Sequence, residues 1–354
     1  MKYPLHIIIR KKVANFVNNF LSLFTKKSSV EKIVSKEDIK TIVLIRPNYR
    51  IGNILFLTPL INELHKHLPE AKIDIIVGMK LAGNILEPMP NVNKIIDIPR
   101  KLLLHPLDLI RYIKESRQKE YDLAINVAGG STSAQIVMAF VRAKYKASFF
   151  DKKLWTHFTH MQTRGKKKFS HMGLESLEFL RFFNIELPQE APSLDIKLTK
   201  EELKKAQEKL DQLLKNHNLN KQDHTVVALF RNARFDKKIE DSWWKELINE
   251  MKKEDESLVF VDILSPDIPT KLDESVLEYA TKDLRELGAF FRVCDLFISA
   301  DTGPLHLAVA SGAKIAALFT KTEIHVYGAL GKENKNLDIT NLSPQDVAKQ
   351  IITS

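Results

Sequence analysis

The chain has 354 residues, more than one domain usually contains, so two domains with a core each are expected. Its single cysteine, Cys294, excludes an intramolecular disulfide and a cysteine-cluster metal site, and fits a reducing cytoplasm. The net charge is +10, but residues 1–36 hold eight basic and one acidic side chain, which leaves only +3 on the remaining 318 residues. A nucleic-acid-binding protein with a basic working face is therefore not expected.

Residues 1–36 form a basic amphipathic leader in which apolar residues from Ile9 to Phe24 recur at helical spacing. No run approaches the roughly 20 apolar residues that a bilayer span needs, and Arg10, Lys11 and Lys12 interrupt a secretory-signal pattern. The pattern favours an interfacial helix on an anionic membrane surface. The alternative is a helix packed on the protein's own body, or a partly disordered arm.

Strand and helix signals alternate through the first half of the chain, which is typical of a parallel sheet covered on both faces. Pro59 is expected to kink or delay the helix that contains it. The predicted strands are 41–45, 72–77, 94–98 and 123–127, and the predicted helices are 53–67, 107–119 and a segment from Gly129-Gly130 to Val141.

The second half repeats this alternation after an irregular middle. Residues 152–168 read as a loop, 174–183 as a helix, 187–192 as a linker and 200–216 as a charged helix. The predicted strands are 225–230, 258–263, 296–299 and 314–319, and Ser343-Pro344 is a helix start.

The fold class expected from these elements is α/β, with two facing doubly wound Rossmann-like domains and a parallel sheet in each. The expected divisions are the leader 1–36, an N-terminal acceptor-side domain 37–190, a C-terminal nucleotide-sugar domain 191–340 and a C-terminal helix 341–354 that packs back on the N-terminal domain.

The segment Asp301-Thr302-Gly303-Pro304-Leu305-His306 lies between a predicted strand and a predicted helix. A helix N-terminus presents unpaired N–H groups and about half a positive charge, which suits a diphosphate. Gly303 lets a diphosphate approach the backbone closely, and the side chains of Thr302 and His306 offer hydrogen-bond donors. The simpler alternative is that Asp301 caps the helix and Gly303 serves the turn.

The loop Arg46–Asn53 occupies the corresponding place after the first strand, at the carboxyl edge where open α/β sheets bind ligands. Two such loops, one per domain, are expected to face each other across a cleft. The alternative is an ordinary strand-to-helix connection.

The RIGN–LTPL segment at Arg50–Leu60 and SADTGPLHLAVASG at Ser299–Gly312 resemble glycosyltransferase family 9, the heptosyltransferase family of lipopolysaccharide core assembly. The resemblance runs from Thr41 to about Gly331 and implies a GT-B fold, a nucleoside-diphosphate sugar donor and an inverting mechanism without a metal or cofactor. The chain has no Asp-x-Asp triplet, which agrees with the absence of a metal-bridged diphosphate.

The resemblance assigns donor binding to Asp301, Thr302, Gly303, Leu305 and His306. A family lysine that neutralises the diphosphate corresponds best to Lys237, seven residues before Trp244, with Lys238 as an open alternative. Arg231 and Asn232 are further candidate donor ligands.

Asn53 departs from the family, which usually has an aspartate here that is proposed as the general base. An amide cannot take the proton of an acceptor hydroxyl, and Arg46–Leu60 contains no carboxylate. Three interpretations stay open: another group is the base, a water relays the proton, or the protein binds donor without turnover. We expect an active enzyme with Asn53, Arg50 and Lys237 at the catalytic position.

For an anionic glycolipid or saccharide acceptor, the resemblance implies basic residues of the N-terminal domain. A family lysine after the 123–127 strand has no counterpart in Gly129–Ser133, which indicates a different acceptor from the standard inner-core sugar. Aromatic candidates that line the cleft are His171, Phe169, Trp155 and Phe158. The basic candidates are Arg100, Lys101, Arg164 and Lys166, followed by Lys167 and Lys168.

The sequence therefore predicts a glycosyltransferase at the inner face of the cytoplasmic membrane. Its alternatives are a nucleotide-sugar epimerase of the same fold, a catalytically impaired nucleotide-sugar-binding protein, and a membrane-surface adaptor that uses the leader.

Overall fold

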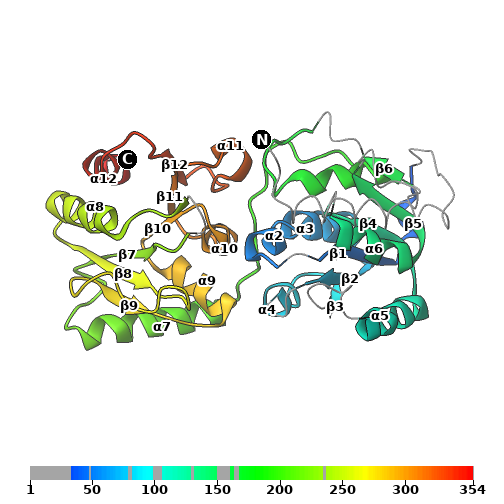
Figure 1. The fold of residues 1–354 in the computed structure, drawn as a ribbon, viewed down its shortest axis with the longest axis horizontal. Helices are drawn as coiled ribbons and strands as arrows, with labels where there is room; N and C mark the ends of the chain where they lie inside the picture. Colours follow the sequence, from blue (N-terminus) through cyan, green and yellow to red (C-terminus); the bar gives the residue numbers. More distant parts are fainter. Residues whose placement is uncertain are drawn as a thin grey trace. The chain divides into compact units, whose positions relative to one another are not determined.

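The computed structural model describes residues 33–47, 49–78, 82–98, 106–128, 131–149, 160–162, 167–233 and 237–353. The chain forms two compact units, each built on one six-stranded parallel sheet (Figure 1). The second unit contains Glu190–Ser354 together with two short segments of the first half, Arg50–Pro59 and Phe169–Leu174. These segments lie before residue 190, so the unit that carries the second sheet is assembled from three stretches of chain.

The first sheet has the strand order β3-β2-β1-β4-β5-β6. Strand β1 is buried along almost its whole length because both faces of a parallel sheet are covered, which explains its unbroken apolar sequence. The strands are β1 (Thr41–Arg46), β2 (Lys72–Val77), β3 (Val92–Asp97), β4 (Glu120–Asn126), β5 (Arg142–Phe149) and β6 (His160–Gln162). The helices are η1 (Lys36–Asp38), α2 (Ile51–Leu55), α3 (Thr58–His67), α4 (Ala82–Leu86), α5 (Pro106–Gln118), α6 (Thr132–Phe140) and η3 (Glu175–Phe183).

The predicted helix 53–67 is two helices, α2 and α3, separated by Phe56 and Leu57. The Thr58 hydroxyl donates to the Leu55 carbonyl at 2.8 Å, and Pro59 has no N–H with which to continue the α2 hydrogen-bond ladder. The interruption expected from Pro59 is therefore confirmed.

Two strands of this sheet were not predicted. Strand β5 carries Arg142, Lys144 and Lys146 among its apolar residues and is buried only near its end, so it lacks the signal of a central strand. Strand β6 lies inside the segment 152–168 that was expected to be a loop, and its three residues pair with the end of β5. Both errors lie toward one edge of the sheet.

The second sheet repeats the topology, with the order β12-β11-β10-β7-β8-β9. The short strands β9 and β12 were not predicted. The strands are β7 (Thr225–Phe230), β8 (Leu258–Ile263), β9 (Leu277–Tyr279), β10 (Leu296–Ala300), β11 (Ile315–Phe319) and β12 (Lys335–Asp338). The helices are α7 (Lys200–Asn216), α8 (Asp241–Glu254), α9 (Leu284–Val293), α10 (Gly303–Ser311), α11 (Ile324–Tyr327) and α12 (Pro344–Ile352).

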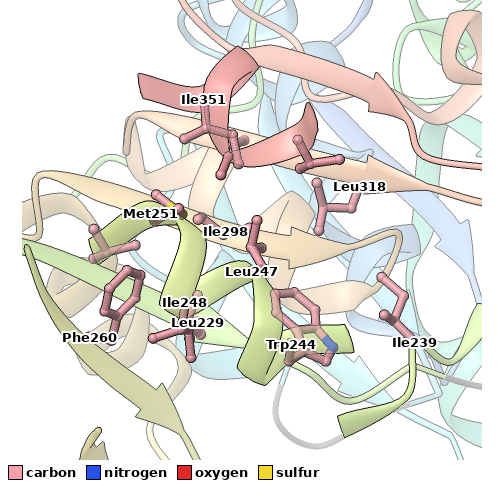
Figure 2. Close-up of a cluster of buried hydrophobic side chains, with 14 of the residues drawn as sticks. Leu229, Ile239, Trp244, Leu247, Ile248, Met251, Phe260, Ile298, Leu318 and Ile351 are labelled. Carbon is pink, nitrogen blue, oxygen red and sulfur yellow. The ribbon is translucent and has the colours of Figure 1, made fainter. Parts of the chain in front are cut away.

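Helices α8 and α12 pack together over one face of this sheet, and Figure 2 shows the core that they close. Trp244 and Leu247 of α8 belong to one cluster with Leu229 of β7, and Ile351 of α12 joins it. The C-terminal helix was expected to pack back on the N-terminal domain. Its apolar face is instead buried against α8, because the side chains of Val347, Ala348 and Ile351 complete this core.

The start of α12 was predicted correctly. The Ser343 hydroxyl accepts from the Asp346 N–H at 3.2 Å, and Pro344 is the first helical residue. Among all the helices that the structure describes, none is long and apolar enough to span a bilayer.

Candidate active site

The candidate site lies at the carboxyl ends of β7 and β10, the two central strands of the second sheet. The strand order reverses between them, because the chain moves outward through β8 and β9 and then returns on the other side through β10, β11 and β12. Doubly wound sheets bind ligands at this reversal point. The residues that follow the two strands, Arg231 and Asp301, are therefore placed at the expected crevice.

Helix α10 begins at the turn that the sequence singled out. Its N-cap is Thr302, whose side chain makes no capping hydrogen bond, and Gly303 and Pro304 are its first residues. Asp301 is not the N-cap, and its carboxylate is bound elsewhere. Because the side chain of Thr302 leaves the first N–H groups uncapped, they are the donors that an anion would meet.

The rest of α10 is buried from Leu305 to Ser311, which fixes the helix at this sheet edge. The side chain of Leu305 is fully buried, so Leu305 can offer a ligand only its backbone N–H. Gly312 ends the helix with a φ of 75°, the left-handed conformation that glycine adopts without strain.

Lys237, Asp301 and His306 come together at the start of α10. The Lys237 ammonium binds Asp301 Oδ2, and His306 Nε2 lies 3.9 Å from Asp301 Oδ1. Lys237 remains one-third exposed, whereas the side chains of Asp301 and His306 are nearly covered. The arrangement places one accessible cation beside a helix N-terminus, as a diphosphate site requires.

His306 is neutral at physiological pH. Burial is the main reason why the pKa of His306 is lowered to about 4; His171 and Lys237 also lower it, while Asp301 raises it. Its Nδ1 is buried and has no hydrogen-bond partner within the described part of the chain. A neutral imidazole has one N–H donor and one lone pair, so this ring can donate at only one nitrogen.

Helix α2, which carries the RIGN motif, packs against α10 within the second unit. A Cβ added at Gly52 would lie 2.9 Å from His306 Cδ2, and one added at Gly303 would lie 3.4 Å from the Ile51 Cβ. Glycine at both positions thus allows the two helix starts to approach closely. Arg50 is the exposed N-cap of α2, and Asn53 is half-buried in its first turn.

Two further side chains surround His306. The Phe56 ring lies edge-on to His306, with centroids 4.8 Å apart, and edge-on to His171, at 5.7 Å. Sequence analysis named His171 as a cleft candidate and missed Phe56, because an aromatic residue between two apolar helices reads as ordinary core. The resemblance also gave no signal for it.

Arg231 is buried in a polar cluster rather than turned toward the start of α10. Its guanidinium donates to Asp262 at 2.9 Å, to Asp241 at 2.8 Å and to the Thr270 carbonyl at 2.7 Å. Asn232 donates to Ser265 Oγ at 3.1 Å. These bonds hold the Ser265–Thr270 loop to the ends of β7 and β8, and donor binding by Arg231 stays a prediction.

Several predicted residues lie outside the part that the structure describes. They include the four basic acceptor candidates Arg100, Lys101, Arg164 and Lys166, the aromatic candidates Trp155 and Phe158, and residues 1–32 of the leader. Within the described ranges, no group of three or more His, Cys, Asp or Glu is arranged to hold a metal ion.

Comparison with known proteins identifies the family. The model of glycosyltransferase family 9 (heptosyltransferase) matches residues 109–352. The chain is 26% identical over 312 residues to lipopolysaccharide heptosyltransferase 3 of Escherichia coli K12, covering 80% of this chain and 83% of that protein. It is 21% identical over 284 residues to the lipopolysaccharide core heptosyltransferase OpsX of Haemophilus influenzae, covering 76% of each.

Solved structures show the same fold. A family 9 glycosyl transferase from Veillonella parvula has a TM-score of 0.72 at 17% identity, covering 89% of this chain and 95% of that one. The E. coli heptosyltransferase WaaC with ADP has a TM-score of 0.69 at 19% identity, covering 88% and 99%. The two parallel doubly wound sheets are accordingly those of a GT-B protein. Since the family model extends from α5 to the end of α12, the chain belongs to glycosyltransferase family 9 and is a glycosyltransferase.

Proposed function

We propose that this enzyme transfers a sugar, heptose or a related one, from a nucleoside diphosphate to a lipopolysaccharide-type acceptor with inversion and without a metal. The observation that carries the proposal is the cluster of Lys237, Asp301 and His306 at the uncapped start of α10. Relatives named as lipopolysaccharide heptosyltransferases, and a relative of known structure described with ADP, support the donor and acceptor classes.

The donor diphosphate is proposed to lie at the N-terminus of α10, where the N–H groups of Gly303 and Leu305 and the Lys237 ammonium face it. In the structure the Lys237 ammonium is paired with Asp301. When the bond from the anomeric carbon to the phosphate oxygen breaks, its electron pair leaves with the diphosphate. The ammonium and the helix N-terminus then stabilise charge that grows in the transition state.

The acceptor hydroxyl attacks the anomeric carbon from the side opposite the diphosphate, which inverts its configuration. Asn53 and Arg50 are proposed to orient this hydroxyl from α2, which is packed on α10 beside His306. The amide of Asn53 donates and accepts hydrogen bonds but cannot hold the departing proton. Water is the proposed carrier of that proton.

Asn53 also favours a second candidate function, a donor-binding protein that lacks turnover. The comparison of wild type with Asn53→Asp separates the two. An enzyme releases nucleoside diphosphate when Asn53 is present. An impaired protein binds the donor but releases nucleoside diphosphate, if at all, only in Asn53→Asp, where the carboxylate is restored.

The acceptor is proposed to be anionic and held by Arg100, Lys101, Arg164 and Lys166.

The leader is proposed to hold the enzyme at the inner face of the cytoplasmic membrane, since its eight basic residues suit an anionic lipid surface. Deleting residues 1–32 tests this: sedimentation with vesicles containing anionic lipid should be lost, and retention would refute it.

The donor site is tested by ligand-induced thermal stabilisation with a panel of nucleoside diphosphates and their sugars. Ligand at about 100 times its dissociation constant stabilises a protein by roughly 2.7 kcal/mol. Lys237→Ala and His306→Ala should abolish the shift. Lys238→Ala is the matched control, because Lys238 is the exposed neighbouring lysine and should keep the shift. Equal losses for both lysines, or no shift with any nucleotide, would refute the proposed site.

A further inference from the structure

His171 is a buried histidine that the proposed chemistry does not use. Its Nε2 donates to the Gly328 carbonyl at 3.0 Å, and its Nδ1 accepts from the Gly173 N–H at 3.0 Å. An imidazole that donates at one nitrogen and accepts at the other is neutral and has a single tautomer. Burial also lowers the pKa of His171, which keeps it in this form.

The bond to Gly328 fastens the segment Phe169–Leu174 to the rest of the second unit. The Met172 N–H donates to the Val326 carbonyl at 2.9 Å, so two hydrogen bonds join this segment to α11 and the residue after it. The segment is distant in sequence from α11, and the His171 side chain supplies one of the two hydrogen bonds that connect them.

Phe56 joins His171 to His306. It lies edge-on to both rings, and the two imidazole centroids are 6.5 Å apart. A Cβ at Gly173 would lie 3.0 Å from both Phe56 Cδ1 and His171 Nδ1, so the absence of a side chain at Gly173 leaves room for these two rings. Gly52 likewise lies against His306, where an added Cβ would be 2.9 Å from Cδ2.

We propose that His171 and Phe56 are positioning residues for the donor site, which hold the His306 ring with Nε2 toward Asp301 and exclude water from it. The inference rests on the proposed donor site, but it concerns residues that do not touch the donor. Three stretches of the chain meet at His306: the end of α2 with its C-cap Phe56, the segment with His171, and α10 itself. Without Phe56 the ring loses its edge contact and gains room to rotate away from Asp301.

The charged and titratable groups that act on His306 are Asp301, Lys237 and His171. Of these, His171 is neutral, and Phe56 lies edge-on to both imidazole rings. A change at Phe56 therefore alters the solvation and orientation of His306 and leaves its charged neighbours in place.

The test is an NMR titration of the His306 imidazole in the full-length protein labelled with ¹⁵N-histidine. The His306 signals are identified by their loss in His306→Gln. Phe56→Leu and His171→Phe are compared with Phe179→Leu, a matched control, since Phe179 is a fully buried phenylalanine of the first sheet's unit that packs against Phe149 and Phe182. His171→Phe keeps an aromatic ring beside Phe56 but removes both hydrogen bonds.

We expect the titration midpoint of His306 to rise by at least about one pH unit in Phe56→Leu and His171→Phe, because water reaches the ring. It should not move in Phe179→Leu. An unchanged midpoint and unchanged ¹⁵N shifts in both folded variants would overturn the inference, whatever their thermal stability.

A second measurement connects the positioning role to donor binding. With the nucleotide that stabilises the wild type most, both variants should bind at least about tenfold more weakly, and Phe179→Leu should bind normally. If no nucleotide binds the wild type, the proposed donor site fails while the titration still decides the positioning role. Normal binding together with a shifted midpoint would refute the connection to the donor.

Discussion

Replacing Arg231 by methionine tests whether this arginine stabilises the fold or serves the donor. Arg231 is 3% exposed and Asp262 is 1% exposed, and their hydrogen bond is 2.9 Å long. Removing one partner of a buried ion pair leaves an uncompensated charge and typically costs about 3–5 kcal/mol. Asp262 would keep only the Leu272 N–H, at 2.9 Å. We expect Arg231→Met to lower the unfolding free energy of this unit by an amount in that range.

The assay is denaturant unfolding followed by tryptophan fluorescence, since Trp244 is fully buried in the same unit. Asp241→Asn is the matched control: Asp241 also binds Arg231, but its side chain is 55% exposed, and exposed pairs contribute at most about 1 kcal/mol. Arg231→Met combined with Asp262→Leu should recover most of the loss, because a hydrophobic pair of similar volume replaces the charges.

The pH dependence provides a further check. Burial already raises the pKa of Asp262 above its usual value, and loss of Arg231 raises it further. A carboxyl group whose pKa is higher in the folded than in the unfolded state binds its proton more tightly when folded, so stability falls as pH rises through the folded pKa. The deficit of Arg231→Met should therefore shrink in acid. A deficit below about 1 kcal/mol at neutral pH, combined with loss of nucleotide binding, would refute the structural role and favour a donor ligand.

Three other outcomes are expected. Between pH 7 and pH 4 the wild type should lose about 3 kcal/mol of stability through His306, because a folded-state pKa of about 4 instead of 6.5 makes folding oppose protonation. His306→Gln should not show this part of the loss. If denaturant unfolding gives the same loss between the two pH values for both proteins, the prediction is wrong. Gly52→Ala should cost about 1–3 kcal/mol and weaken nucleotide binding, since its Cβ would meet His306; unchanged thermal stability and affinity would show that the helix starts are not tightly packed. Ile351→Ala should cost about 2–5 kcal/mol in unfolding monitored at Trp244, as expected for a truncation in the core under α8, and a loss confined to the first sheet's unit would show that α12 packs elsewhere.

The central strands were predictable from the sequence because strands buried on both faces consist of unbroken apolar runs. Strands β1, β7 and β11 are of this kind, and each was placed within one residue of its observed ends. Strand β8 was also placed correctly, although Asp262 interrupts its apolar run. The start of α12 was predictable for a local reason, since its capping box involves only Ser343, Pro344 and Asp346. The turn before α10 was also local, as a strand end, a glycine and a helix start lie in consecutive residues.

Four strands at or next to a sheet edge, β5, β6, β9 and β12, were missed because their pairing depends on neighbours that are distant in sequence. Strand β5 is basic and only partly buried, and β6, β9 and β12 have three or four residues each, so none has a pattern of its own. The packing of α12 failed for the same reason: an amphipathic helix shows which face it buries, but not against which partner.

The turn Asp301–His306 between a strand and a helix and the two-sheet architecture could be read from the sequence, and the family resemblance pointed to Lys237. The folded structure was needed to show that Lys237 pairs with Asp301, that Arg231 is bound to Asp262 and Asp241, and that α2 packs on α10. It also brought Phe56, His171 and His306 together from three stretches of chain. Local signals depend on neighbours within a few residues, whereas these contacts arise because burial of apolar surface draws distant segments into one core.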